Sequence, residues 1–538
     1  MRRRRRSQRL PTAACLLLLA ATASGCARLP RDPPELAGRH VAGFAGGPIE
    51  LRGLRFGGGG PGHEVVVASG GSSWRVASAS ADVLGWEDER IELRLPDAPL
   101  AHDTTLRVRT PWGASAPARL ERFAHDHFEI RPEAERVSPP LAVAVDARHR
   151  VWIHQEFHTA LHVLDPASGR IERLDIPVAT DPGPFATRLY GGARTFVSEL
   201  GEDILVDPAG RVWLTQGGGF LYGGPHPNHS RILSYRPAGP GEPDGGFRTW
   251  TVPGDRNEVK GIEWDPVRRR IWFSEGSASW PARLTSFDPE RVTPDGDGGE
   301  SVAGAAASHA GGAPVPGPRA CAPDGDCFRS WLLPDPGAQP AHLRIDRDGY
   351  VWTTGSWSNA LYRLDPETGE FLTYPLPASR SQVPEAETVG SCPWQLRIGP
   401  DGNLYFSEFF DASVGRFDAA RAEDPACTRL DESGRNPCID EHAVVPASAR
   451  LRVHSIAFDA DGRLWFTEHE DRDGQQASLG FVTADWREVV RLPSLARFPA
   501  DAAPSNDGIA IDPVTGDIWF AEFWRGRIGR LRAAGGGG

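Results

Sequence analysis

Seven side chains occupy the same position of a sequence repeat, and several of them can do acid–base or electrostatic chemistry. The position lies five residues before the aspartate, or its counterpart, that opens the turn of each repeat. It is occupied by Leu141, Glu202, Lys260, Ala341, Trp394, His454 and Asp507. Histidine can act as a general acid or base, and lysine can stabilise negative charge that develops during a reaction. We therefore predict that His454 and Lys260 are catalytic, and that Glu202 and Trp394 share a ring with them around a central channel.

A second polar position follows the aromatic residue of each repeat by three residues. It holds Gln155, Gln216, Glu275, Gly355, Glu408, Glu468 and Glu522. Buried polar side chains need hydrogen-bond partners, so we expect most of this set to be structural. His154, Glu156 and His158 would share one strand face and could bind a metal ion, although a polar cluster near a loop is the simpler interpretation.

Seven repeats of the form Asp-x-x-Gly-x-apolar-Trp must position these side chains. Their aromatic residues are Trp152, Trp213, Trp272, Trp352, Tyr405, Trp465 and Trp519. Each repeat contains an apolar strand, a turn of the Asp-Gly type, the aromatic strand and two further strands. One such unit cannot bury both of its faces, so the units must stack as the blades of a propeller. The sequence thus predicts an all-β protein with a seven-bladed β-propeller at 125–533, interrupted by an inserted flexible loop at 293–330 that is rich in Gly, Ala and Pro.

The last repeat is incomplete, because the chain contains only three of its four strands. The third strand covers 527–531 and is followed by glycines. The segment 128–131, just before the first repeat, is the predicted donor of the missing strand. This pairing would close the ring and remove an exposed sheet edge.

Residues 41–124 carry short alternating strands separated by Gly, Pro and Asp clusters, a pattern typical of a β-sandwich. The segment resembles an IPT/TIG immunoglobulin-like domain. The motifs that carry this resemblance are 53–57 (GLRFG), 83–91 (VLGWEDERI) and 110–115 (TPWGAS). The resemblance implies a spacer or binding module, and we see no catalytic constellation in it.

The N-terminus has the order of a secretory signal, with a basic cluster, a short apolar run and small residues within 1–25. The segment 23–26 (ASGC) resembles a lipobox, so Cys26 is the predicted lipidation site and 26–40 the predicted tether. Ordinary cleavage beside a chance cysteine is the alternative. No other segment is apolar and long enough for a transmembrane helix, so the lipid would be the only membrane attachment, at the outer membrane or cell surface.

Charge and composition limit the partners of the exported chain. Removal of 1–25 takes six arginines and no acids, so the formal net charge falls from −12 to −18. Such an acidic body is a poor nucleic-acid binder. We expect a monomer whose ligand is an extracellular or periplasmic small molecule, peptide or glycan.

Five cysteines follow the predicted lipidation site, in a compartment where disulfides persist. Proximity in sequence favours pairing Cys321 with Cys327 and Cys427 with Cys438, which leaves Cys392 over. No cysteine spacing suggests zinc.

The repeats themselves resemble the virginiamycin B lyase (streptogramin lyase) family. The resemblance spans about 128–532, and its motifs are 461–468 (DGRLWFTE), 518–522 (IWFAE) and 527–530 (RIGR). Members of that family open a cyclic depsipeptide at its ester by elimination, without adding water. They use magnesium, histidine and glutamate at the channel mouth, so the resemblance implies a lyase with Mg²⁺ as its cofactor.

The site residues of that family transfer only in part. His454 matches a family histidine of the sixth blade, but Ser505 and Asp507 replace the Glu-x-His of the next blade. Glu522 lies near a further family glutamate, with a spacing one residue shorter. The resemblance then implies that Asp507 and Glu522 hold the metal. These departures favour a non-catalytic surface protein that binds a protein, peptide or glycan, whereas the polar ring favours a metal-assisted lyase on a cyclic peptide or related ester.

Overall fold

The computed structural model describes 32–45, 47–95, 100–101, 103–130, 140–155, 160–176, 203–217, 230–238, 246–252, 258–277, 280–292, 294, 328–381, 383–444, 451–470, 478–492 and 506–533. Several predictions fall outside these described residues: the signal peptide 1–25, Cys26, Glu156, His158, Glu202, Cys321, Cys327, Ser505 and nearly all of the loop 293–330. Within the described parts, no helix has both the length and the apolar character needed to cross a membrane.

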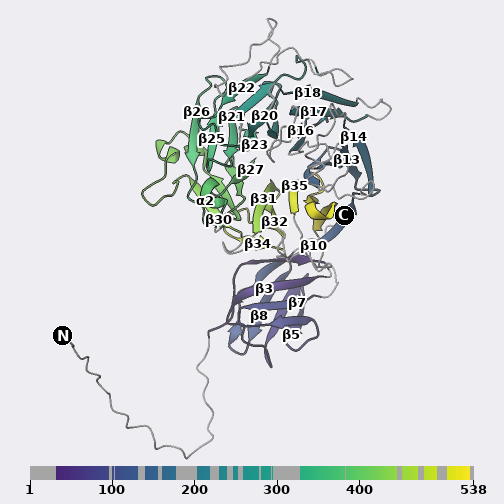
Figure 1. Ribbon diagram of the computed structural model, residues 1–538. Coiled ribbons are helices and arrows are strands. Elements are labelled where there is room, and N and C mark those ends of the chain that lie inside the picture. Colours follow the sequence, from purple (N-terminus) through teal and green to yellow (C-terminus); the bar gives the residue numbers. More distant parts are fainter. Residues whose placement is uncertain are drawn as a thin grey trace, which may run out of the picture.

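The repeats form antiparallel sheets of four strands each, which makes the larger part of the molecule a β-propeller (Figure 1). The first sheet consists of β11 (Pro140–Val145), β12 (Val151–Gln155), β13 (Ala160–Asp165) and β14 (Arg170–Asp175). The second consists of β15 (Ile204–Val206), β16 (Val212–Gln216), β17 (Arg231–Arg236) and β18 (Gly246–Thr251). The third consists of β19 (Val259–Asp265), β20 (Arg270–Ser277), β21 (Trp280–Phe287) and β22 (Arg329–Leu332).

The fourth sheet consists of β23 (Pro340–Ile345), β24 (Val351–Gly355), β25 (Ala360–Leu364) and β26 (Phe371–Pro375). The fifth consists of β27 (Pro393–Ile398), β28 (Leu404–Glu408), β29 (Ser413–Phe417) and β30 (Ile439–Ala443). The sixth consists of β31 (Leu451–Phe458), β32 (Leu464–Glu470), β33 (Leu479–Val482) and β34 (Val489–Arg491). The last repeat supplies β35 (Asn506–Ile511), β36 (Ile518–Glu522) and β37 (Arg527–Ala533). The innermost strands β11, β15, β19, β23, β27, β31 and β35 contact one another in a ring, so they surround the channel.

The repeated aspartate and tryptophan hold each turn together. In four repeats the indole Nε1 donates to the Oδ2 atom of the aspartate six residues earlier, at 2.7–2.9 Å; the pairs are Trp152 with Asp146, Trp213 with Asp207, Trp352 with Asp346, and Trp465 with Asp459. Trp272 and Trp519 follow their aspartates by seven residues, and their indole Nε1 atoms lack a partner among the described residues. The six-residue spacing is therefore what allows the bond.

This contact gives a first testable expectation. We expect Asp346→Ala to lower the free energy of unfolding by about 2–3 kcal/mol, because it leaves the indole N–H of the buried Trp352 unsatisfied. Asp348→Ala, in the same turn with a side chain 67% exposed, should change it by less than about 0.5 kcal/mol. Urea denaturation of the two variants measures the difference, and equal losses would contradict a structural role for the bond.

The missing strand of the last sheet comes from the segment before the first repeat, as the sequence predicted. The strand β10 (Ala118–Glu129) pairs antiparallel with β37, with Phe128 opposite Ile528 and Phe123 opposite Ala533. The strand starts ten residues earlier than the predicted donor segment. Its first half belongs to the preceding domain, where it pairs with β2 (His40–Phe44) in parallel and with β8 (Thr105–Thr110).

The N-terminal part consists of two packed sheets. One has the order β1 (Glu35–Leu36), β3 (Pro48–Leu54), β7 (Arg90–Arg94), β6 (Val83–Trp86); the other contains β5 (Ser72–Ala77), β4 (Glu64–Ser69) and β8, with the short β9 (Gly113–Ala114) at its side. Their inner faces share an apolar core that includes Leu51, Val67 and Val108. Two predicted boundaries shift: β1 and the start of β2 lie inside the predicted tether 26–40, and position 124/125 falls within β10 rather than in a linker.

This N-terminal part is packed directly on the propeller. Phe123 of β10 meets the Trp465 ring edge-on, with centroids 5.3 Å apart, and belongs to the same apolar cluster. Glu121 accepts from Arg463 at 2.6 Å, and His40 Nδ1 lies 2.9 Å from Glu488. Figure 1 shows the sandwich strands β3, β5, β7 and β8 beside the propeller, next to β10.

Candidate functional site

A register irregularity lies at or beside the ring position in every innermost strand except β15, whose paired residues 204–206 begin after that position. The register shifts between β19 and β20, β23 and β24, β27 and β28, β31 and β32, and β35 and β36 all fall at the ring position, and β11 has one beside it. Such bulges re-aim a side chain away from its expected face. Glycine follows the ring residue where strands meet most closely: a Cβ on Gly261 or Gly508 would lie 2.5 or 2.4 Å from a carbonyl oxygen of the next strand.

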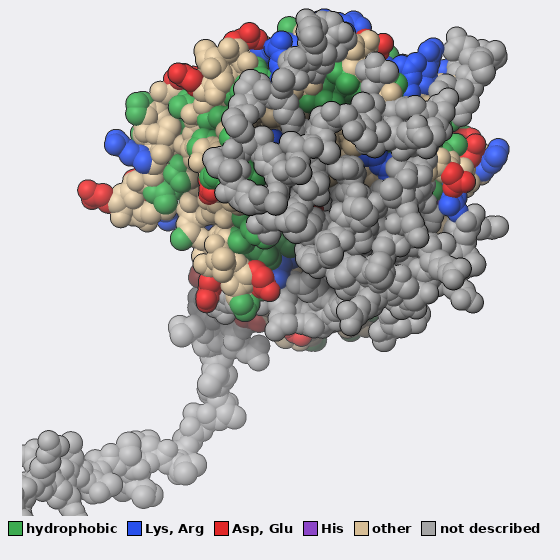
Figure 2. Space-filling view, turned by 45° about the horizontal axis from the view of Figure 1, so that its top comes forward, with side chains coloured by type: hydrophobic (Ala, Val, Ile, Leu, Met, Phe, Trp, Pro, Cys, Tyr) green, Lys and Arg blue, Asp and Glu red, His purple; other side chains and the backbone are tan. Residues whose placement is uncertain are grey.

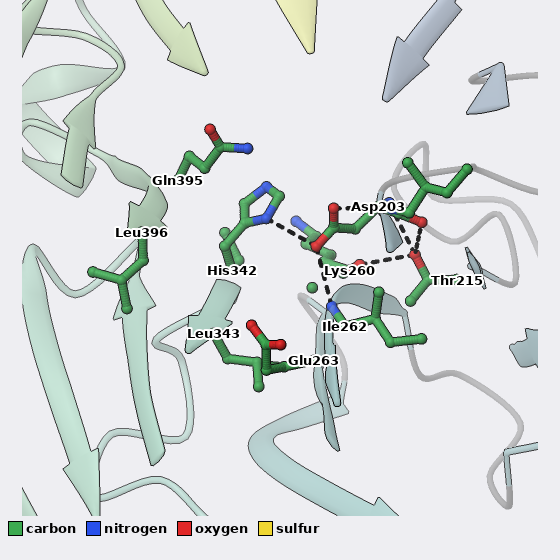
Figure 3. A network of polar contacts seen from close by, with 12 residues as sticks. Asp203, Thr215, Lys260, Ile262, Glu263, His342, Leu343, Gln395 and Leu396 are labelled. Atoms are coloured by element: carbon green, nitrogen blue, oxygen red, sulfur yellow. Dashed lines mark hydrogen bonds and ion pairs between the residues drawn. The ribbon is translucent and has the colours of Figure 1, made fainter. Parts of the chain in front are cut away.

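One side of the mouth combines a buried cation with aromatic rings. The Lys260 side chain is nearly fully buried, and its Nζ lies 5.1 Å from the centroid of the Trp394 ring. The same Nζ is 3.9 Å from Glu258, and the Lys260 carbonyl accepts from Thr215 at 2.8 Å (Figure 3). The Arg452 guanidinium lies over the Phe409 ring at 5.8 Å. This side of the mouth can therefore bind an apolar group and an anionic group of a ligand.

The next side of the mouth holds two histidines and a carboxylate. Trp394 lies 6.0 Å from His454, and His454 is stacked on His469 with centroids 6.1 Å apart. His469 Nδ1 is 2.7 Å from Asp507 Oδ1. A carboxylate can only accept at this distance, so Nδ1 carries the proton and Nε2 is left as the basic nitrogen. The arrangement is that of an oriented general base.

His454 itself is a neutral side chain at physiological pH. Its ring is surrounded by protein atoms although it keeps some accessible surface, as expected for a group lining a channel. Burial lowers the pKa of His454 to about 4, although Asp507 works against the shift. His454 can accept a proton or hydrogen-bond a ligand, but at pH 7 it is not the imidazolium that a general acid requires.

Below the mouth, an acid and a histidine are paired across the channel (Figure 3). Asp203 Oδ2 lies 3.2 Å from His342 Nδ1 and accepts from the Ile262 N–H at 3.2 Å. Burial raises the pKa of Asp203, but the neighbouring His342, Arg344 and Arg397 outweigh it, and the pKa falls to about 2. Asp203 directly follows Glu202, the predicted ring residue that lies outside the described part.

Part of the second polar position is held by hydrogen bonds, as expected for structural residues, whereas neither polar atom of the buried Gln216 side chain has a partner among the described residues. Glu468 is fully buried and is bound by Arg491 at 2.7 Å and by the Ser478 N–H at 2.9 Å. Glu275 accepts from the Thr285 hydroxyl. His154 is likewise buried, and burial lowers its pKa to about 4.

Glu522 belongs to this structural group, which corrects its assignment as a metal ligand. Its carboxylate is held by Arg527, with Nε at 2.7 Å, and lies 3.8 Å from Arg525 and 3.5 Å from His125 Nε2. The Asp507 carboxylate instead contacts His469. The predicted pairing of Asp507 with Glu522 around one metal ion is therefore not the arrangement found, because two guanidinium groups already neutralise Glu522.

The magnesium implied by the family resemblance stays a prediction, because no cluster of three potential ligands lies at the channel mouth among the described residues. Mg²⁺ requires six oxygen ligands in near-octahedral geometry. Across the described residues, only Asp424, Cys427 and Cys438 place three potential ligand atoms within 4.8 Å of one another. The two cysteines of that trio form the predicted disulfide Cys427–Cys438. Cys392 is a free thiol, and burial raises its pKa to about 12, which leaves it unreactive.

Glu408 is the member of the second position whose buried carboxyl is most perturbed. Burial and then the neighbouring Glu441 and Asp411 raise its pKa well above its ordinary value of 4.5. The folded state thus binds a proton more tightly than the unfolded chain, and stability falls as pH rises from about 4.5 through the raised pKa.

We therefore expect Glu408→Gln to be more stable than the parent at pH 8 and similar to it at pH 4. The gain should be about 1.4 kcal/mol for each unit by which folding raises the pKa. Urea denaturation at the two pH values measures it, with Glu367→Gln, 76% exposed, as the matched control. A gain that is equal at both pH values would contradict the titration.

The channel mouth of a β-propeller is thus the candidate site, lined by Lys260, Trp394, His454, His469 and Asp507. His469 was not predicted, although it directly follows Glu468 in the sixth repeat and is a second histidine of that blade. The sequence argument followed the innermost strands alone, whereas His469 lies near the end of the second strand, β32, and reaches Asp507 of the next blade.

Comparisons with known proteins find similarity among solved structures alone. No family model matches the chain, and no curated protein matches it. Among solved structures, a streptogramin B lyase is 19% identical, covering 76% of this chain and 98% of that chain with a TM-score of 0.49. A catalytically inactive virginiamycin B lyase from Staphylococcus aureus with quinupristin is also 19% identical, covering 76% and 99% with a TM-score of 0.47.

An auxiliary nutrient binding protein from Bacteroides thetaiotaomicron is 11% identical, covering 94% of this chain and 99% of that chain with a TM-score of 0.40. None of these likenesses carries the functional argument, because function depends on the site rather than on the fold.

Proposed function

We propose that the protein is an exported lyase whose seven-bladed propeller opens an ester of a cyclic peptide by β-elimination. The observation that supports this most strongly is the 2.7 Å contact between His469 Nδ1 and Asp507 Oδ1 at the channel mouth. The carboxylate fixes the tautomer and the orientation of the ring, which is what a general base requires. The motifs shared with the virginiamycin B lyase family support an elimination rather than a hydrolysis.

In the proposed reaction, His469 Nε2 removes a proton from the carbon next to a carbonyl group of the substrate. The electron pair left on that carbon forms a carbon–carbon double bond, and the ester's bond between the β-carbon and oxygen breaks. The oxygen leaves as a carboxylate with the bonding electrons, so no water is consumed. The imidazolium formed is stabilised by Asp507 and then returns its proton to solvent.

The other mouth residues assist without transferring a proton. Lys260 provides a positive charge that stabilises the enolate-like transition state, and burial strengthens that effect. His454 is neutral and acts as a hydrogen-bonding neighbour, because its pKa is about 4. The rings of Trp394 and Phe409 offer flat apolar surfaces to the substrate.

We also propose that the protein acts at the cell envelope as a lipid-anchored monomer. The order of the N-terminal segment and the position of Cys26 support export and anchoring. The immunoglobulin-like sandwich would then lie between the anchor and the propeller. The ligand would be an extracellular or periplasmic molecule.

The alternative function is binding without catalysis, with a peptide, protein or glycan as the ligand. It is favoured by one observation: the carboxylates predicted to hold magnesium are engaged by His469 and by Arg527. A family mechanism that depends on that metal would then be lost, and the aromatic mouth would remain as a binding surface.

The experiment incubates the purified protein with a streptogramin-type cyclic depsipeptide, in magnesium and in EDTA, and follows it by chromatography and mass spectrometry. A ring-opened product of unchanged mass supports elimination, and a product heavier by one water would show hydrolysis instead. Intact substrate in both buffers would reject the lyase proposal for this substrate class. Equilibrium dialysis of the same depsipeptide then decides whether it is bound.

A further inference from the structure

One acid–histidine pair of the channel has no part in the proposed elimination. Asp203 Oδ2 lies 3.2 Å from His342 Nδ1, and the two residues are 6% and 5% exposed. Asp203 directly precedes β15 of the second blade, whereas His342 belongs to β23 of the fourth. Gly261 lies on the blade between them, and a Cβ there would be 2.7 Å from the His342 Cα. The glycine therefore lets the strands approach closely enough for the pair to form across one blade.

The charge of Asp203 is not needed for the hydrogen bond that this position makes to the next blade. Asp203 Oδ2 accepts from the Ile262 N–H at 3.2 Å. At the equivalent position of the fifth blade, Gln395 Oε1 accepts from the Ile456 N–H at 2.5 Å. A neutral amide is thus enough for the bond between blades. A carboxylate at Asp203 additionally orients His342 and balances two nearby guanidinium groups.

The contact with Asp203 leaves His342 with one free hydrogen-bond acceptor. Burial lowers the pKa of His342 from 6.5, and Asp203 opposes this shift only in part, so the ring is neutral at pH 7. A carboxylate can only accept, so Nδ1 carries the single ring proton and Nε2 keeps its lone pair. Figure 3 shows the second ring nitrogen on the side of the ring that faces away from Asp203. Among the described residues, no donor binds it.

The same imidazole lies beside Trp394, the aromatic ring residue of the fifth blade. The two rings meet edge-on with centroids 6.3 Å apart. Lys260 approaches this indole from the third blade, past the short Ala341 of the fourth, with Nζ 5.1 Å from the centroid. Trp394 itself keeps some accessible surface. One partly exposed indole is therefore bordered by a hydrogen-bond donor and by a hydrogen-bond acceptor.

We propose that Lys260 and His342 together bind one secondary amide of the ligand beside Trp394. The carbonyl oxygen accepts from Lys260 Nζ, and the amide N–H donates to His342 Nε2. A trans peptide group carries one acceptor and one donor in a single plane, so it complements the two side chains while a flat face packs on the indole. His342 is then a specificity-determining residue, positioned by Asp203.

The place of the ligand at the mouth is taken from the proposed function, and the amide site narrows its substrate class. In the elimination, Lys260 stabilises charge on the carbonyl group next to the carbon that loses its proton. That carbonyl then belongs to a secondary amide, whose N–H reaches His342. A tertiary amide at this point, formed by proline or an N-methylated residue, leaves the buried acceptor without a donor and is bound more weakly.

Isothermal titration with streptogramin-type cyclic depsipeptides, each N-methylated at one amide, tests this site. The reference protein is the full chain carrying Asp507→Asn, which slows turnover and keeps the substrate contacts. We expect one amide at which methylation weakens binding to the reference protein by at least about tenfold. Adding His342→Phe, which keeps a ring beside Trp394 but no acceptor, should reduce that effect to less than about twofold.

Two further variants in the same background serve as controls. His442→Phe removes an imidazole that packs on Trp486, with centroids 4.6 Å apart, on the outermost strand β30. It should leave the effect of methylation unchanged. His342→Gln can still donate to Asp203 and accept from the ligand, so it should restore part of the effect, and it preserves the partner of Asp203 if His342→Phe lowers stability.

Equal weakening by methylation with and without His342→Phe would overturn the amide site, because the methyl group then acts only on the shape of the macrocycle. So would a reference protein that binds every methylated analogue as tightly as the unmethylated depsipeptide. Neither result bears on the elimination itself, which product analysis of the protein without Asp507→Asn measures separately. If no depsipeptide binds, the amide site and the proposed substrate class are both rejected.

Discussion

Asp507→Asn is expected to lower kcat for ring opening by about 10³- to 10⁴-fold while leaving KM nearly unchanged. An asparagine can present its amide NH₂ to His469 Nδ1, which would favour the tautomer that has lost its basic Nε2. The substrate contacts at Trp394 and Phe409 stay intact, so binding should persist. Stopped-time chromatography of product over a range of substrate concentrations separates the two constants.

A merely structural role for Asp507 predicts a different pattern. A structural role would change the thermal midpoint, kcat and KM together. A positioning role instead lowers kcat with KM nearly unchanged, and it also shifts the acid limb of the pH–rate profile to lower pH. That shift follows because the positively charged form of His469 loses the carboxylate that stabilises it.

The matched control for this prediction is another His–Asp pair, away from the mouth. His149 Nδ1 lies 2.7 Å from Asp512, and the histidine side chain is 42% exposed. His149→Asn should leave the rate unchanged, because asparagine tolerates the positive φ of this position and the pair is not part of the site. An Asp507→Asn protein that retains the parental kcat would exclude His469 as the base.

The repeat pattern predicted most of the architecture because each repeat specifies its own strands and turns through short-range interactions. An alternating strand followed by an Asp-Gly turn and a large aromatic residue specifies a hairpin, and Phe128 supplied the closing strand in the expected place. The ring register also placed Lys260 beside Trp394, and Trp394 beside His454. Trp394 and His454 occupy identical positions on adjacent blades, whereas Lys260 contacts Trp394 across the blade that carries the short Ala341 at this position.

The site residues that sequence reasoning missed depend on contacts between different strand positions. His469 extends from the second strand of one blade to Asp507 on the first strand of the next, so no single repeat position contains both. The misassignment of Glu522 had a local signal that was available: Arg525 and Arg527 follow within five residues and neutralise it.

The second large effect concerns the junction between the sandwich and the propeller. We expect Phe123→Ala to lower the free energy of unfolding by about 3–5 kcal/mol. Phe123 is 3% exposed, contacts Trp465 edge-on, and lies on the strand that pairs with β37. Truncation leaves a cavity among Ala42, Phe481 and Leu531, where the two parts of the molecule share one apolar cluster.

The pattern of the loss distinguishes a shared core from a flexible spacer. Because β10 is hydrogen-bonded in both the sandwich and the last propeller sheet, Phe123→Ala should lower the unfolding midpoint of both parts together. Hydrogen exchange read separately on 64–77 and on 518–533 measures each part, and Leu54→Ala, at a side chain 48% exposed, serves as the control for the sandwich. If the propeller segment kept its protection while the sandwich lost it, the closing strand would contribute less to the ring than its seven paired residues indicate. Matching losses in both segments would mean that the N-terminal part is needed for the propeller to close, so the channel mouth depends on a domain that contributes no residue to it.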